Sequence, residues 1–91
     1  MGSITGIVKR VEELVNVTDT FKKRNLIITT EEQYPQTLQV EFIQDKVVLL
    51  DAILEGEKLN VHYNLRGREV EKVAGEPKVF NSLHGWKIEK V

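Results

Sequence analysis

The sequence predicts an all-β protein, a five-stranded OB-fold Greek-key barrel with one short helix between the third and fourth strands. Three observations lead to this prediction. Apolar and polar residues alternate along several segments, which is the pattern of half-buried β-strands. One segment, residues 44–54, instead carries apolar residues at helical spacing. The elements follow the order of three strands, one helix and two strands, and a chain of 91 residues removes exposed sheet edges best by closing its sheet.

Length and composition indicate one domain over residues 1–91. The chain has no cysteine, which excludes disulfides, thiolate metal sites and cysteine nucleophiles and fits a cytoplasmic location. No apolar run has the length of a membrane-spanning helix, so no membrane association is expected. The N-terminus also lacks the pattern of a signal peptide.

The first strand is expected over residues 4–15, where β-branched residues are frequent and Gly6 marks a bend or bulge. A long, bent first strand can pair with both halves of a small barrel. Residues 16–20 are polar turn formers and are expected to form a loop. The second strand covers residues 21–30, in which three basic residues precede a β-branched run.

The third strand is expected over residues 36–43, after a connection that ends at Pro35. The helix then covers residues 44–54, with Asp45 as its N-terminal cap. Its apolar side is formed by Val47, Leu50, Ile53 and Leu54. In the alternative architecture, an SH3-like barrel, the same segment would be a strand or a loop.

The fourth strand follows a glycine-containing turn at Gly56 and has the clearest alternation in the chain. Its core face is expected to be Leu59, Val61, Tyr63 and Leu65, and its polar face ends in Arg66 and Arg68. The last strand covers residues 78–91, with Trp86 and Ile88 on one face and a bend or bulge at Gly85.

An OB-fold binds its ligand on the face of strands two and three, between the loops that join strands one and two and strands four and five. Those loops are expected near residues 16–21 and 70–78. Basic residues flank both of them, whereas residues 31–57 carry an excess of acidic residues, and the net charge is −1. The basic residues expected to contact a polyanionic ligand such as a nucleic acid are Lys22, Lys23 and Arg24 beside the first loop, and Arg66, Arg68, Lys72 and Lys78 beside or within the second.

Binding of single-stranded nucleic acid also needs aromatic side chains on which its bases can stack. The best candidates are Phe21, Tyr34 and Phe80, because they lie in or next to predicted turns. Phe42, Tyr63 and Trp86 alternate with polar neighbours and are expected in the core.

No catalytic or metal-binding pattern is present, so the protein is expected to be non-catalytic and to need no cofactor. The histidines, His62 and His84, lie on different strands without metal-ligand spacing, and both are expected to be structural. No glycine-rich phosphate loop, nucleophile elbow or HExxH sequence occurs.

Several segments resemble the bacterial single-stranded-DNA-binding proteins. The stretch 53–61 looks like that family's passage from helix to fourth strand, and residues 65–68 are similar to its basic strand end. Residues 31–35, 67–69 and 80–89 look more closely like a small family of uncharacterised bacterial OB-fold proteins, catalogued as a domain of unknown function. The resemblance covers nearly the whole chain and implies the OB-fold. Val70 stands where relatives often have an aromatic residue.

The sequence therefore predicts a protein that binds single-stranded nucleic acid through a basic barrel face and a few stacking aromatics. DNA is the favoured ligand over RNA, and assembly into a dimer or tetramer is expected. The alternative function is a protein-interaction or assembly module that uses the same barrel without nucleic acid. The near-neutral total charge and the small number of stacking aromatics favour that alternative.

Overall fold

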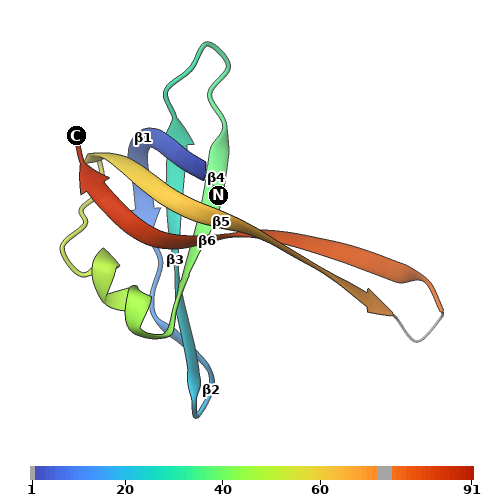
Figure 1. Ribbon diagram of the computed structural model, residues 1–91. Coiled ribbons are helices and arrows are strands. Elements are labelled where there is room, and N and C mark those ends of the chain that lie inside the picture. The colour runs from blue at the N-terminus through green and yellow to red at the C-terminus, as the bar shows by residue number, and fades with distance from the viewer. Residues whose placement is uncertain (1, 72–74) are drawn as a thin grey trace.

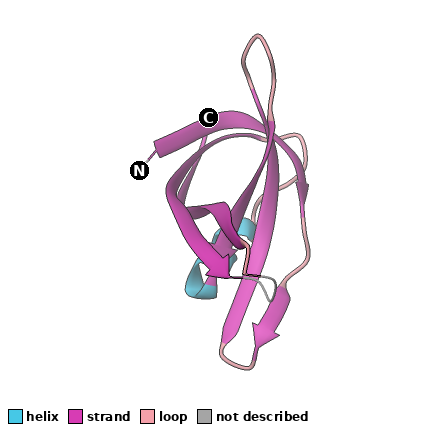
Figure 2. Ribbon diagram, turned by 90° about the vertical axis from the view of Figure 1, so that its right-hand side faces the viewer, coloured by secondary structure: helices cyan, strands magenta, loops and turns pink. Residues whose placement is uncertain are grey.

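The computed structural model describes residues 2–71 and 75–91, and in this part of the chain six strands form one sheet. The strands are β1 (Gly2–Val11), β2 (Val15–Thr18), β3 (Phe21–Thr30), β4 (Thr37–Ile43), β5 (Lys58–Glu71) and β6 (Pro77–Lys90). Their order is β1-β5-β6-β4-β3-β2, and β1 also pairs with β3. This additional pairing closes β1, β3, β4, β5 and β6 into the predicted barrel (Figure 1, Figure 2).

Strand β1 closes the barrel by pairing with two strands in succession. Residues 2–7 pair with β5, and residues 6–11 pair with β3. Gly6 lies at the changeover, where a Cβ atom would stand 2.3 Å from the carbonyl oxygen of Thr29. The β-bulge itself is at Lys9, which the β1–β3 register skips. The expected pairing with both barrel halves is confirmed, and glycine is needed at Gly6 because two backbones approach each other closely there.

The prediction of a loop at residues 16–20 was wrong for residues 16–18, which belong to β2, a sixth strand outside the five-stranded barrel. Strand β1 ends at Val11, and the short strand β2 forms a hairpin with the start of β3. All residues of β2 are exposed, because this hairpin extends beyond the barrel and covers no core. A strand without a buried face has no reason to show the alternation by which strands are recognised.

The helix is present between β4 and β5, but it is a 3₁₀-helix, η1 (Gln44–Leu50), shorter than the predicted 44–54. Ile43, not Asp45, is the N-cap residue, and no side chain caps the helix. Val47, Leu50 and Ile53 are buried, whereas Leu54 is exposed. Leu54 lies beyond the end of η1 at Leu50, so the helical spacing on which its predicted contact rested does not extend to it.

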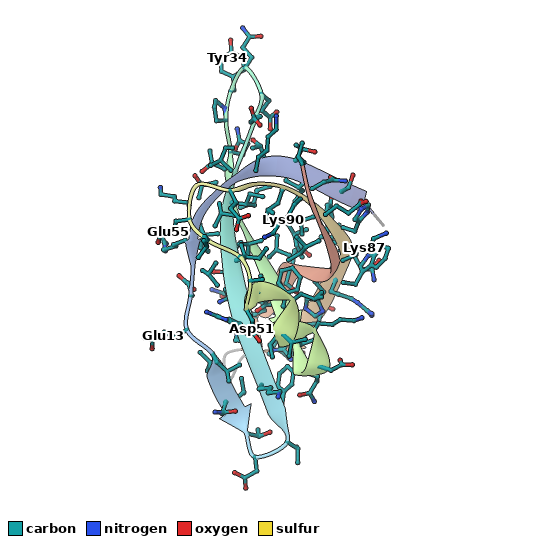
Figure 3. All side chains as sticks on the ribbon, turned by 90° about the vertical axis from the view of Figure 1, so that its left-hand side faces the viewer. Glu13, Tyr34, Asp51, Glu55, Lys87 and Lys90 are labelled. Atoms are coloured by element: carbon teal, nitrogen blue, oxygen red, sulfur yellow. The ribbon has the colours of Figure 1, made fainter. Side chains whose placement is uncertain are left out.

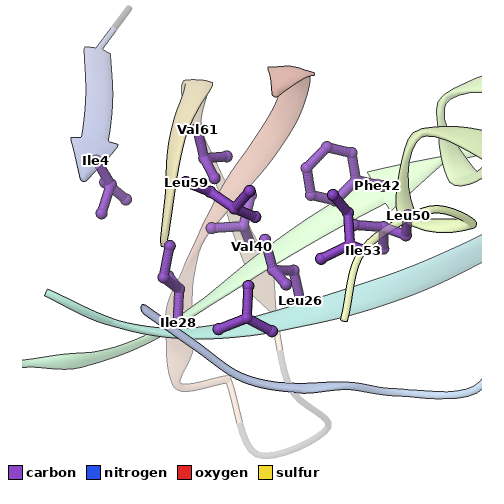
Figure 4. Packing of buried hydrophobic residues seen from close by; sticks show 10 residues of the cluster. Ile4, Leu26, Ile28, Val40, Phe42, Leu50, Ile53, Leu59 and Val61 are labelled. Atoms are coloured by element: carbon purple, nitrogen blue, oxygen red, sulfur yellow. The ribbon is translucent and has the colours of Figure 1, made fainter. Parts of the chain in front are cut away.

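The core lies inside the barrel and is closed on one side by η1 and the segment after it (Figure 4). Its members are Ile4, Val8, Leu26, Ile28, Val40, Phe42, Leu50, Ile53, Leu59 and Val61. Of the predicted core face of β5, Leu59 and Val61 are fully buried and Tyr63 packs against the cluster. Leu65, however, is 65% exposed.

Leu65 is exposed because β5 and β6 leave the barrel together as a long two-stranded arm. Strand β6 pairs with β4 only at Leu83 and His84. Beyond these residues the arm, which consists of residues 65–71 and 75–82, projects away from the sheet (Figure 1). Its side chains therefore lack a covering layer on either face.

Strand β6 is bulged at Trp86, next to the glycine where a bulge was expected. His62 pairs with Lys87 and Tyr63 pairs with Gly85, so Trp86 has no partner residue in β5. Trp86 packs against His62 with ring centroids 5.3 Å apart, whereas Ile88 packs against the core. The bulge reverses the side-chain alternation, and the prediction of Trp86 and Ile88 on one core-facing side was therefore wrong.

A carboxylate ties the turn before β5 to the end of β6. Glu57 Oε1 accepts a hydrogen bond of 2.6 Å from the backbone N–H of Leu54, and Oε2 lies 3.2 Å from Lys90 Nζ. The hydrogen bond from Leu54, followed by that from Lys90, lowers the pKa of Glu57. The ionised carboxylate therefore stabilises the fold above the ordinary pKa of glutamate, and this contribution is lost as the pH falls through the lowered folded value.

We expect Glu57→Gln to lower the free energy of unfolding at neutral pH, because the amide loses the ionic part of both contacts. The difference from the wild type should shrink as the pH falls below about 4.5, the ordinary pKa of the group. Urea denaturation of both proteins at a series of pH values measures this difference in the free energy of unfolding. Glu55→Gln makes the same charge change in an exposed residue of the same turn and should leave the stability at neutral pH nearly unchanged. A difference for Glu57→Gln that stays constant down to acid pH would contradict the assignment.

Candidate nucleic-acid interface

A groove of about 510 Å³ lies between the β2–β3 hairpin and the β5–β6 arm. Its floor comes from β3, β4 and β6, which are neighbours in the sheet. The lining residues are Val17, Phe21, Lys23, Glu41, Ile43, Arg66, Gly67, Arg68, Phe80, Asn81, Ser82 and His84. The groove thus occupies the barrel face on which an OB-fold binds its ligand.

Two aromatic rings line the groove from different hairpins. Phe21 is the first residue of β3 and is half-buried, and Phe80 is 46% exposed on the arm. Val17 of β2 adds an exposed aliphatic side chain beside them. Rings and aliphatic groups of this kind offer the faces on which nucleobases stack.

The cations of the groove are Lys23, Arg66 and Arg68. The arm's register places Arg66 opposite Ser82 and Arg68 opposite Phe80, so both guanidiniums share the arm face that turns to the groove. Both arginines are exposed. Within the described part of the chain neither forms an ion pair, which leaves both available to a phosphate.

The basic run at residues 22–24 does not form one patch, because successive residues of a strand point to opposite faces. Lys23 lines the groove. Arg24 lies on the opposite face, where Nε donates a 2.7 Å hydrogen bond to the carbonyl oxygen of Glu12 and Nη1 lies 3.4 Å from Oδ1 of Asp51, the residue after η1. Lys22 is exposed and lies outside the groove lining. Arg24 is therefore engaged in structural contacts.

Three other residues proposed from the sequence do not line the groove or cannot be placed. Tyr34 is 74% exposed at the tip of the β3–β4 loop, at the opposite end of the molecule from β2 (Figure 1, Figure 3). Lys78 is exposed on the arm but is absent from the groove lining. Lys72 lies outside the described residues. The structure thus brings together Phe21, Lys23, Arg66, Arg68 and Phe80.

A polar cluster on the groove floor was missed by the sequence reasoning. Glu41 Oε1 lies 3.3 Å from Lys23 Nζ, and Glu41 Oε2 lies 3.2 Å from His84 Nε2. Ser82 Oγ is 3.1 Å from the same histidine nitrogen. Glu41 could have been noticed as the charged residue on the polar face of the third strand. His84 was hidden by the bulge, which makes face assignment in β6 uncertain from sequence.

No group of three or more histidine or acidic side chains suited to a metal ion occurs among residues 2–71 and 75–91. In the same residues, no helix has both the length and the apolar character needed to cross a membrane.

The closed barrel, the helix after β4 and the position of the groove define a protein of the OB-fold class. A solved structure agrees with this assignment. The mitochondrial single-stranded DNA binding protein Rim1 from S. cerevisiae superposes with a TM-score of 0.74, covering 99% of this chain and 92% of that chain at 14% sequence identity. At this identity the similarity concerns the fold.

The chain belongs to the family described as a domain of unknown function (DUF3127), whose family model matches residues 3–89. Membership confirms the resemblance inferred from the sequence. No curated protein matches the chain significantly.

Proposed function

We propose that this protein binds single-stranded DNA in the groove between the β2–β3 hairpin and the β5–β6 arm, without catalysis. The observation that carries the proposal is the combination of two aromatic rings, Phe21 and Phe80, with two exposed arginines in one groove. The similarity in fold to a single-stranded DNA binding protein supports it.

The chemistry of the groove suits an unpaired strand better than a duplex. Stacking on Phe21 and Phe80 requires bases whose faces are free, and bases inside a duplex are already stacked on one another. Arg66 and Arg68 lie on the arm beside these rings, where they can contact the phosphates that link the stacked bases. The arrangement needs no particular base on the rings, because every base has a stacking face.

Fluorescence anisotropy of a labelled oligo-dT, titrated with the protein at several salt concentrations, tests the proposal. We expect binding at low salt and a linear fall of log K with log salt concentration, because phosphate contacts release counterions. A duplex of the same length should bind more weakly. Absence of binding at low salt, or an affinity that does not change with salt, would refute nucleic-acid binding in this groove.

A second candidate function, a protein-interaction or assembly module, is favoured by exposed aliphatic side chains on the arm. Leu65 and Val79 are each 65% exposed, and neither lines the groove. Burial of this arm face between copies would give a homodimer or tetramer, and a cytoplasmic location is part of the proposal. Light scattering that shows a strict monomer at high concentration would count against assembly.

A further inference from the structure

An acidic residue lies on the floor of the groove that we propose to bind a polyanion. Glu41 belongs to β4, the strand between β3 and β6, and its side chain is 17% exposed. Lys23 of β3 donates a hydrogen bond of 3.3 Å to one of its oxygens, and His84 Nε2 of β6 lies 3.2 Å from the other. Both contacts join neighbouring strands of the barrel, so the carboxylate is held in one place.

A phosphate would not be expected to bind over this floor. Two negative charges at short range repel each other, and the repulsion is stronger where the surroundings are partly buried. The unpaired cations of the described groove, Arg66 and Arg68, lie on the arm beside the floor. A single-stranded nucleic acid in the groove is therefore bound most favourably with its phosphates toward the arm and its base edges toward Glu41.

We propose that Glu41 selects the base bound over the floor and favours cytosine over uracil or thymine. This inference rests on the proposed function, because it concerns a base of the strand bound in the same groove. A carboxylate is only an acceptor and has about four lone-pair sites on its two oxygens. The hydrogen bond from Lys23 occupies part of that capacity, and the remainder is open to a base.

The preference follows from the group at C4 of the pyrimidine. Cytosine carries an amino group there, which donates a hydrogen bond to a carboxylate. Uracil and thymine carry a carbonyl oxygen at the same place, which a carboxylate repels. The neighbouring ring nitrogen of cytosine is an acceptor, and the ammonium of Lys23 has donors for it. The Glu41–Lys23 pair thus presents an acceptor beside a donor, which complements the cytosine edge.

Comparison of oligo-dC with oligo-dU of equal length tests the inference on the wild-type protein. The two oligomers have the same backbone and ring size and differ at the base edge, and a mildly alkaline buffer keeps cytosine unprotonated. We expect oligo-dC to bind about fivefold or more tightly, the lower range for a specific side-chain contact to a base. Equal affinities for the two oligomers would overturn the inference and leave the proposed function standing. Failure of both to bind would refute the proposed function and the inference with it.

Glu41→Gln assigns the preference to this residue. The amide retains the size of the side chain but can turn its NH₂ group toward a carbonyl, so binding of oligo-dU should strengthen and the two affinities should converge. Glu55→Gln, the same charge change at an exposed turn residue outside the groove, should leave the ratio unchanged. An undiminished preference for oligo-dC in Glu41→Gln would overturn the role of Glu41.

A modified ligand gives the same test without a change to the protein. An oligomer of N4,N4-dimethylcytosine has no amino hydrogen to donate. It should bind the wild-type protein no more tightly than oligo-dU does. Binding as tight as that of oligo-dC would overturn the inference, whatever the stability of the Glu41→Gln variant.

Discussion

Replacement of both Arg66 and Arg68 by glutamine should weaken the binding of oligo-dT by about tenfold or more at low salt. Both side chains are exposed on the groove face of the arm, and in the described part of the chain neither has an ion-pair partner. Two phosphate contacts would be lost, so the slope of log K against log salt concentration should fall by about 1.4, at about 0.7 for each contact with a single strand. Anisotropy titrations at several salt concentrations measure both quantities.

The matched control is Lys9→Gln with Lys46→Gln, which removes the same charge from two exposed residues outside the groove. This variant should change the affinity far less, because neither lysine contacts the groove, and the difference should be clearest at 0.1 M salt, where the Debye length is only about 10 Å. Equal losses in the two double variants would show that net charge controls binding and that the arm is not the contact surface. Arg24 is unsuitable as a control, since its contacts with Glu12 and Asp51 support the fold.

Gly85→Ala should destabilise the fold by about 2 kcal/mol or more, in the range of overpacked cores. A Cβ atom at this position would lie 2.3 Å from Cζ of Phe42 and 2.5 Å from Cε2 of the same ring. Phe42 is fully buried, so its ring cannot move aside without disturbing the core. Urea denaturation, read as the midpoint and slope of the transition, measures the loss.

A second substitution shows whether the clash is the cause. Gly85→Ala should cost less in a Phe42→Leu background than in the wild type, because leucine lacks the ring atoms that the new methyl group meets, although Phe42→Leu alone also lowers the stability. Gly67→Ala is the matched control, because its Cβ would meet the end of the Asn81 side chain at 3.0 Å and otherwise only the Phe80 carbonyl oxygen, at an ordinary contact distance of 3.8 Å. A loss in Gly85→Ala that Phe42→Leu does not reduce, or an equal loss in Gly67→Ala, would contradict the explanation.

Part of the groove could be predicted from the sequence, because local sequence features identify several of its residues. Phe21 begins a strand, and Arg66 and Arg68 end a polar strand face, so each is visible from its neighbours in the chain. The basic run at 22–24 was misleading, since a strand divides adjacent residues between two faces. Lys23 reaches the groove, and Arg24 reaches the other side of the sheet.

The polar floor could not be predicted, because its members come from three strands and their register is a tertiary property. Glu41 pairs with His84 across a parallel contact between β4 and β6 that spans only two residue pairs. The bulge at Trp86 also changes which residues of β6 face inward. A one-residue change in register moves every following side chain to the other face.

The sequence by itself determined the barrel, the position of the helix and most of the core, because the spacing of the hydrophobic residues indicates which face of each strand is buried. Only the tertiary structure decided where burial ends. Leu65 continues the pattern of Leu59 and Val61, yet it is exposed because β6 parts from β4 at Leu83 and the arm projects alone. Local alternation describes one strand, whereas burial depends on whether a second layer covers it, and no segment of a single strand carries that information.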